Sequence, residues 1–193
     1  MTLALPPQDR LVLLQTAREA IGARLGRRPA RFPPAPPELS TPCGAFVTLT
    51  IRGELRGCIG HTAACQPLLE AVKDVAVSSA FDDPRFPSLS PEEWPHVRIE
   101  ISVLSPFERI TDIARINVGV HGIMVKNGRR SGLLLPQVAS ERGWDRETFL
   151  AHSCRKAGLP GDAWRWPDTR IEIFSATVFQ EDQEEGQIRG EIG

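Results

Sequence analysis

The stretch Glu54–Gly60, with the sequence ELRGCIG, places a thiol between two glycines and an arginine two residues before it. In an extended strand alternate side chains share a face, so Arg56 and Cys58 are expected to lie side by side. A nearby guanidinium favours the thiolate, which is the nucleophilic form of cysteine. Gly57 and Gly60 have no side chains, so another backbone or a flat ligand could approach them closely. The pattern therefore makes Cys58 a candidate nucleophile.

A structural interpretation of the same cysteine competes with this one. Free cysteine is among the most buried residue types and often fills a small space in a core. A nucleophilic cysteine also needs a base and an orienting group. His61 falls on the opposite face of the expected strand from Cys58, and the two-residue spacing of His152 and Cys154 puts them on different sides of a helix. The residues alone leave both interpretations open.

A second candidate surface follows a predicted turn. The run Arg129–Ser131 could hold a phosphate or a carboxylate, although paired arginines at a strand edge also serve as solvated charges that deter aggregation. Gln137 follows a proline at a strand end, where polar side chains often belong to binding sites. In the stretch DDPRF, Asp83 and Arg85 are expected to pair and stabilise a turn.

Composition narrows the class of protein. The chain has 193 residues, a net charge of −1, 41% hydrophobic and 24% charged residues, which is typical of a globular protein in solution. The net charge produces no overall positive field that would attract nucleic acid or anionic lipid, but it does not exclude a local basic groove. The four cysteines form no CxxC pair, so neither a metal site nor a disulfide scaffold is expected. Without a signal peptide or an apolar run of about 20 residues, a cytoplasmic protein is expected.

Hydrophobic periodicity and turn signals predict a mixture of helices and strands without regular alternation. Helices are expected over residues 8–25, 66–81 and 146–157, and strands over residues 46–51, 54–59, 98–104, 120–126, 129–135 and 170–179. Arg52-Gly53 and Asn127-Gly128 are the expected hairpin turns. The order favours an α+β fold with a mixed, largely antiparallel sheet and flanking helices. Residues 5–180 are expected to form a single domain, and the acidic residues 181–193 a flexible tail.

The stretch Leu55–Gly60 resembles the hallmark of the AMMECR domain family, whose prokaryotic members are called AmmeMemoRadiSam system protein A. Further stretches resemble the family in the same order: FDDPRFPSLSPEE, IEISVLSP, GVHGIMVKNGRRSGLLLPQVASERGWDRETFL and CRKAGLPGDAW. The resemblance covers about residues 5–180. It implies one α+β domain with a larger and a smaller subdomain around a shared cleft.

The resemblance also implies which residues form a site. It places the suspected site at Leu55–Gly60, and it leaves out His61, because the family often has threonine there. Arg129 or Arg130 is then expected to line the same cleft. The secondary candidates that it implies are Asp83, Arg85, Arg129, Ser131, Gly132, Pro136 and Gln137.

Two functions remain open at this level. The first is an enzyme that depends on Cys58 and acts on a small or nucleotide-like substrate, a class suggested by a family-level description of RNA or nucleotide modification. The second is a non-catalytic adaptor that binds a Memo-like or radical-SAM protein, because the family resemblance implies that both are encoded in the same gene neighbourhood. The reaction, the substrate and any cofactor are left undetermined by the sequence.

Overall fold

The computed structural model of the chain describes residues 5–181 and 188–191, and these residues divide into two compact units. The larger unit contains residues 5–104, 177–181 and 188–191, and the smaller unit contains Ser105–Ala176. Each unit combines an antiparallel sheet with helices. The predicted α+β class with flanking helices is therefore confirmed.

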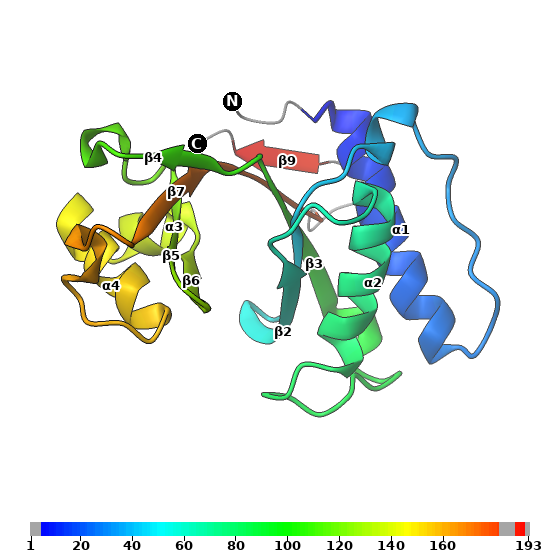
Figure 1. Ribbon diagram of the computed structural model, residues 1–193. Helices are drawn as coiled ribbons and strands as arrows, with labels where there is room; N and C mark the ends of the chain where they lie inside the picture. Colours follow the sequence, from blue (N-terminus) through cyan, green and yellow to red (C-terminus); the bar gives the residue numbers. More distant parts are fainter. Residues whose placement is uncertain (1–4, 182–187, 192–193) are drawn as a thin grey trace. The chain divides into compact units, whose positions relative to one another are not determined.

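The larger unit is built on a five-stranded sheet with the order β2-β1-β3-β8-β9. Two helices that contact each other, α1 (Pro7–Leu25) and α2 (Leu68–Phe81), pack on one face of this sheet (Figure 1). Alternate residues of the central strands, such as Val47 and Leu49, are fully buried beneath these helices, and the residues between them face the other way. The strands are β1 (Ala45–Ile51), β2 (Glu54–His61), β3 (Val97–Leu104), β8 (Ala176–Glu181) and β9 (Ile188–Glu191).

The smaller unit is built on a four-stranded sheet with the order β4-β7-β5-β6. Its strands are β4 (Glu108–Ile110), β5 (Gly122–Asn127), β6 (Arg130–Leu134) and β7 (Arg170–Phe174). The helix α4 (Arg146–Lys156) packs on β5 and β6, and the short helix α3 (Pro136–Glu141) precedes it. Asp145 caps α4, since its carboxylate accepts a hydrogen bond from the Thr148 amide at 2.8 Å.

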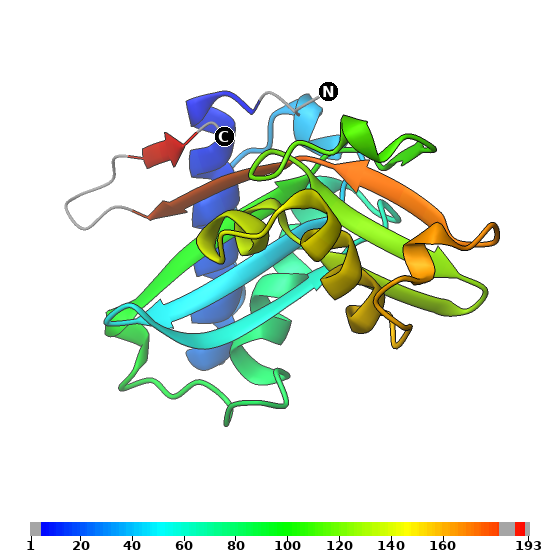
Figure 2. The same cartoon turned by 90° about the vertical axis from the view of Figure 1, so that its left-hand side faces the viewer.

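Short 3-10 turns connect these elements. They are η1 (Pro37–Ser40), η2 (Trp94–His96), η3 (Ile113–Arg115) and η4 (Ala163–Arg165). Both predicted hairpins are present, and Arg52-Gly53 form the first turn as expected, with φ values of 55° and 84°. The second turn lies one residue later than predicted, because Asn127 ends β5 and pairs with Arg130, which leaves Gly128, with a φ of 58°, and Arg129 as the turn residues. Figure 2 shows the long β1–β2 hairpin in front of the helices of its own unit.

One predicted strand is in fact two. Residues 170–179 were expected to form a single strand, but β7 belongs to the smaller sheet and β8 to the larger one. The break lies at Ser175, whose carbonyl accepts a hydrogen bond from the Ser105 amide and whose amide donates to Ser105 Oγ, both at 2.9 Å. These bonds to a residue 70 positions away remove Ser175 from either ladder, and no local pattern indicates them.

Part of the expected C-terminal tail is assigned to strands. Glu181 ends β8, and Ile188–Glu191 pair with β8 as β9, while the flexible tail over residues 181–193 stays a prediction. Residues 182–187 and 192–193 lie outside the described part of the chain. Among the helices that are described, each is too short or too polar to span a bilayer.

Candidate functional site

Cys58 lies on β2, an edge strand of the larger sheet, directly opposite Thr48 of β1. Because Val47 and Leu49 face the helices, Thr48 and its cross-strand neighbour face the opposite side. The Thr48 hydroxyl donates a hydrogen bond to Cys58 Sγ at 3.3 Å. The cysteine is half-buried, so it is neither core filler nor a fully exposed thiol.

The expectation that Arg56 and Cys58 share a face is wrong. The pairing of β1 with β2 shifts between Leu49 and Thr50, so that Thr50 lies opposite Leu55 while Thr48 lies opposite Cys58. This shift is a bulge that adds one residue to β2 and breaks its strict alternation. Leu55, three residues before the cysteine, therefore shares the thiol's face.

Arg56 is instead the buried partner in an ion pair with the partly exposed Glu93. Its guanidinium donates to both carboxylate oxygens of Glu93, at 2.8 and 3.0 Å, and Arg56 is only 9% exposed. Glu93 also accepts a hydrogen bond from the Ser90 amide, and Ser90 Oγ accepts one from the Glu93 amide, which is the reciprocal arrangement of a capping box. The hydrogen bond from Arg56, and then that from Ser90, lowers the pKa of Glu93. Arg56 thus anchors β2 to the loop that follows α2.

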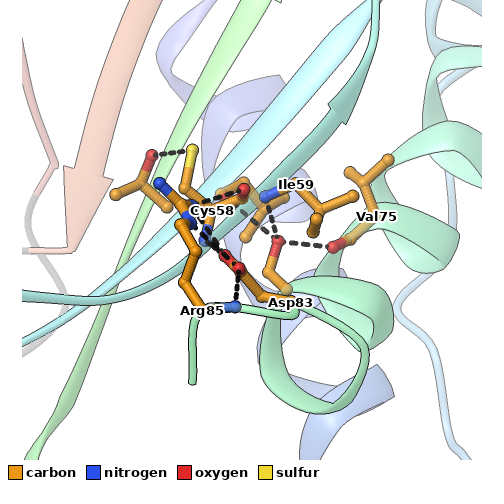
Figure 3. Close-up of polar contacts among 8 residues, drawn as sticks. Cys58, Ile59, Val75, Asp83 and Arg85 are labelled. Atoms are coloured by element: carbon orange, nitrogen blue, oxygen red, sulfur yellow. Dashed lines mark hydrogen bonds and ion pairs between the residues drawn. The ribbon is translucent and has the colours of Figure 1, made fainter.

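Asp83 and Arg85 hold the backbone of Cys58 on both sides (Figure 3). The Cys58 amide donates to Asp83 Oδ2 at 2.9 Å, and the Cys58 carbonyl accepts from Arg85 Nη2 at 3.1 Å. The two side chains are joined by hydrogen bonds of 2.7 and 2.9 Å. The expected Asp83–Arg85 pair is therefore present, and it also occupies the open hydrogen-bonding edge of β2. We call this arrangement the Asp83–Arg85 clamp.

Asp83 and Arg85 each shift the pKa of the other. Hydrogen bonds from the Arg85 guanidinium, and then from the Cys58 and Arg85 amides, hold the pKa of Asp83 far below its usual range, against the effect of burial. The pKa of Arg85 is raised, first of all by its hydrogen bond to Asp83. Arg85, whose side chain is about half exposed, is thus the cation beside the thiol.

The two glycines of the motif make room for the protein itself. A Cβ on Gly57 would lie 2.1 Å from the backbone carbonyl oxygen of Ser79 in α2, and one on Gly60 would lie 2.2 Å from the ring of Phe46. Ser79 Oγ additionally accepts a hydrogen bond from the Ile59 amide at 2.9 Å. The predicted close approach to Gly57 is therefore confirmed, and the approaching group is the backbone of α2.

Sequence reasoning missed a polar row that crosses three strands at the thiol. Glu100 of β3 lies directly opposite Thr48, which in turn lies opposite Cys58. Arg98 lies opposite Thr50 in the next row, on the same face. The signal was present in the strict alternation of FVTLTI and RIEISVL, but only the strand pairing brings their polar halves together.

The remaining predicted residues belong to the smaller unit. Arg129 and Ser131 are exposed on either side of the start of β6, and Gln137 is half-buried in α3. Gly132 lies against the C-terminal end of α4, where a Cβ would be 2.3 Å from the Ala157 amide nitrogen. Pro136, at the first position of α3, is buried. Because the Leu55–Gly60 motif lies in the other unit, the cleft expected between the two remains a prediction.

The histidines do not supply a base through any described contact with the thiol. His61 is exposed at the end of β2, and His152 stacks on Trp144 with ring centroids 3.9 Å apart. Among the described residues, no group of three or more metal-ligating side chains is positioned to hold a metal ion.

Comparisons with known proteins give the chain its family. The model of the AMMECR1 family matches residues 14–179. Protein MK0488 of Methanopyrus kandleri is 45% identical over 188 residues, which cover 92% of this chain and 90% of that protein. A protein of Methanothermobacter thermautotrophicus is 45% identical over 178 residues, covering 88% and 93%.

A solved structure agrees with this assignment. The crystal structure of the uncharacterized protein PH0010 from Pyrococcus horikoshii matches with a TM-score of 0.85 and 43% identity, covering 95% of this chain and 97% of that one. The sequence match and the shared fold span nearly the whole chain. The chain therefore belongs to the AMMECR1 family.

Proposed function

We propose that the protein is a thiol-dependent enzyme in which Cys58 attacks an electrophilic atom of a small or nucleotide-like substrate. The supporting observation is the division of roles within the motif. Arg56, Gly57 and Gly60 are engaged in contacts that hold the fold. The thiol of Cys58, in contrast, is half-buried on the side of the sheet away from the helices, beside a hydroxyl donor.

The clamp gives this thiol a fixed position. Because Asp83 binds the amide of Cys58 and Arg85 binds its carbonyl, the direction of the Cα–Cβ bond is set by the backbone. Fixed geometry of this kind is what nucleophilic catalysis requires. The Thr48 hydroxyl supplies a hydrogen-bond donor at the sulfur, and the Arg85 guanidinium supplies a positive charge at the same residue.

The chemical step can be written with its atoms balanced. A bond forms between Cys58 Sγ and the electrophilic atom, and the bond to the leaving group breaks with its electron pair. The thiol proton passes to water before the attack. A second displacement, by water or an acceptor group, then releases the product and restores the thiolate. The four free cysteines fit a reducing, cytoplasmic setting.

The test compares two single-cysteine variants in a mixture of unknown substrates. Intact protein is incubated with a metabolite extract, and changes in the extract are followed by untargeted mass spectrometry. Cys58→Ser should abolish every change that the protein causes, whereas Cys65→Ser, at an exposed cysteine outside the clamp, should preserve them. Identical changes with Cys58→Ser and with the unaltered protein would disprove the enzyme proposal.

One observation supports the adaptor as the second candidate. Leu55 is 43% exposed and shares the face of Cys58, and exposed large apolar side chains are frequent anchors of protein interfaces. In this alternative, the face binds a Memo-like or radical-SAM protein of the AmmeMemoRadiSam system. Calorimetry with both purified partners should then show binding that Leu55→Glu weakens and Cys58→Ser leaves unchanged. Absence of binding to both proteins argues against the adaptor.

A further inference from the structure

One face of the smaller sheet gathers positive side chains from several strands. The core-facing residues of β5 and β7, including Val125 and Ile171, pack in the cluster that contains α4 residues. The alternate residues of the same strands point to the opposite face. Their pairing partners on β4 and β6 share that face. This face also contains the buried side chains of Met124 and Phe174. We call its charged and hydroxyl-bearing residues the basic face: Arg109, Lys126, Ser131, Arg170 and Glu172.

The register places two cations of the basic face directly opposite each other. Lys126 of β5 pairs with Arg170 of β7 on one side and with Ser131 of β6 on the other. Directly opposite residues have Cβ atoms about 4.5–5.5 Å apart, and like charges in this position destabilise a sheet. The sequence thus includes an unfavourable pair on a surface where either residue could have been neutral. Such local conflicts are expected at functional sites.

One carboxylate offsets only part of this charge. Glu172 binds Lys126 Nζ at 2.7 Å and lies directly opposite Arg109. Three cations therefore surround one anion, which leaves two positive charges in surplus. The whole smaller unit has the same bias, with eleven Lys and Arg against eight Asp and Glu, whereas the entire chain has a net charge of −1.

We propose that the basic face binds the phosphate group of a small ligand between Lys126 and Arg170, with the Ser131 hydroxyl as a hydrogen-bond donor. A phosphate monoester carries about −1.5 to −2 charges at neutral pH, which matches the surplus of two. Arginine binds phosphate through two parallel N–H groups, and lysine contributes a point charge. The ligand also relieves the repulsion between the two cations. The proposal is independent of the role of Cys58.

The match in charge favours a small ligand over a nucleic-acid strand. A strand presents one negative charge at each of many phosphates, and binding it takes a row of cations. The basic face instead concentrates its surplus around a single pair of opposed residues, Lys126 and Arg170. A single phosphate group is the ligand that this arrangement can neutralise.

The test uses inorganic phosphate as the probe and two variants with the same charge change. Backbone amide NMR spectra are recorded during titration with phosphate, with chloride holding the ionic strength constant. Arg170→Gln removes one of the two opposed cations. Lys156→Gln removes a cation of the same unit at the C-terminal end of α4, outside the basic face. Phosphate-induced shifts should map to residues 126, 131 and 170.

The outcomes decide between the proposal and its alternatives. Arg170→Gln should weaken phosphate binding about tenfold, as expected for the loss of a charge-assisted hydrogen bond, and Lys156→Gln should leave it unchanged. Equal weakening by both variants, or no shift at these residues in the unaltered protein, would overturn the proposal. It would also be overturned if a short single-stranded RNA bound far more tightly than phosphate, with a salt dependence that reports several released ions.

Discussion

Around Cys58, in the larger sheet, charged side chains are matched to partners: Arg56 binds Glu93, and Arg85 binds Asp83. In the smaller sheet, Lys126 lies opposite Arg170, and the single carboxylate of that face, Glu172, forms an ion pair with Lys126. Within the part of the chain that the structure describes, Arg109 and Arg170 have no ion-pair partner. The first arrangement stabilises the fold by itself, whereas the second needs a ligand to be neutral.

The Leu55–Gly60 motif and the basic face therefore differ in what their charges do. In the motif, the charges and glycines position β2 against α2 and the loop after it, and the thiol of Cys58 stays half-buried on the opposite face of the sheet. On the basic face, Glu172 pairs with Lys126, but Arg170 lies opposite the same lysine without a carboxylate of its own, so this opposition of like charges needs another explanation. Substitutions in the first region should therefore lower stability strongly, and those in the second should change ligand binding with little effect on stability.

The largest expected effect is that of Gly57→Ala. Its Cβ would lie 2.1 Å from the Ser79 carbonyl oxygen, and because this oxygen belongs to the helix backbone, strand and helix must separate. We expect the free energy of unfolding to fall by at least about 3 kcal/mol. Chemical denaturation monitored by circular dichroism measures this change.

A matched substitution in α1 tests whether the effect belongs to the close approach. Gly22→Ala places its Cβ no nearer than 3.6 Å from another group, so alanine fits. Since glycine is a poor helix former, this variant should gain about 0.5–1 kcal/mol. If both alanine variants changed stability by the same amount, the contact between β2 and α2 would not be the cause.

The next effect is that of Asp83→Asn, which breaks the clamp while keeping its volume. The amide side chain cannot accept all the hydrogen bonds that the carboxylate receives from Cys58 and Arg85. We expect a loss of about 2 kcal/mol in the free energy of unfolding, the range for hydrogen bonds to a charged group. The neighbouring Asp82→Asn, at an exposed aspartate, should change stability by less than about 0.5 kcal/mol.

The clamp also predicts a pH dependence with a definite sign. Arg85 holds the pKa of Asp83 below its ordinary value of about 3.9. A carboxylate whose pKa is lower in the folded state stabilises the fold above the unfolded pKa, and this contribution disappears as the pH falls through the folded pKa. The stability difference between the unaltered protein and Asp83→Asn should be constant from neutral pH to about pH 5 and shrink below about pH 4. A difference that instead grew in acid would contradict the assigned ion pair.

Thiol labelling tests which arginine affects the reactivity of Cys58. In a Cys65→Ser background, iodoacetamide should label Cys58 in the folded protein. Cys43 and Cys154 should not react, because burial raises the pKa of both thiols. Arg85→Gln should slow labelling at neutral pH, since it removes the nearby cation, whereas Arg56→Gln should not. Slower labelling with Arg56→Gln alone would restore the pairing of Arg56 and Cys58 that strict alternation predicted.

The sequence predicted local features well and the site only in part. The Arg52-Gly53 turn and the helix α4 depend on neighbouring residues, so their patterns were sufficient. The bulge at Arg56 depends on pairing with another strand, and the clamp joins Cys58 to a residue 25 positions away. Tertiary contacts of this kind leave no periodic signal. The opposition of Lys126 and Arg170, 44 positions apart, was hidden for the same reason.

The smallest expected effect is the one that most directly tests why the basic face exists. If Lys126 and Arg170 repel each other, Arg170→Gln should raise the free energy of unfolding at low salt in a phosphate-free buffer, by about 0.2–0.5 kcal/mol. Arg170→Glu should raise it further, because it places a carboxylate opposite Lys126. Both gains should fade as added chloride screens the charges. Thermal unfolding over a range of chloride concentrations measures them. If both variants instead lost stability at low salt, Arg170 would be a stabilising residue, and the repulsion that a bound phosphate is proposed to relieve would not exist.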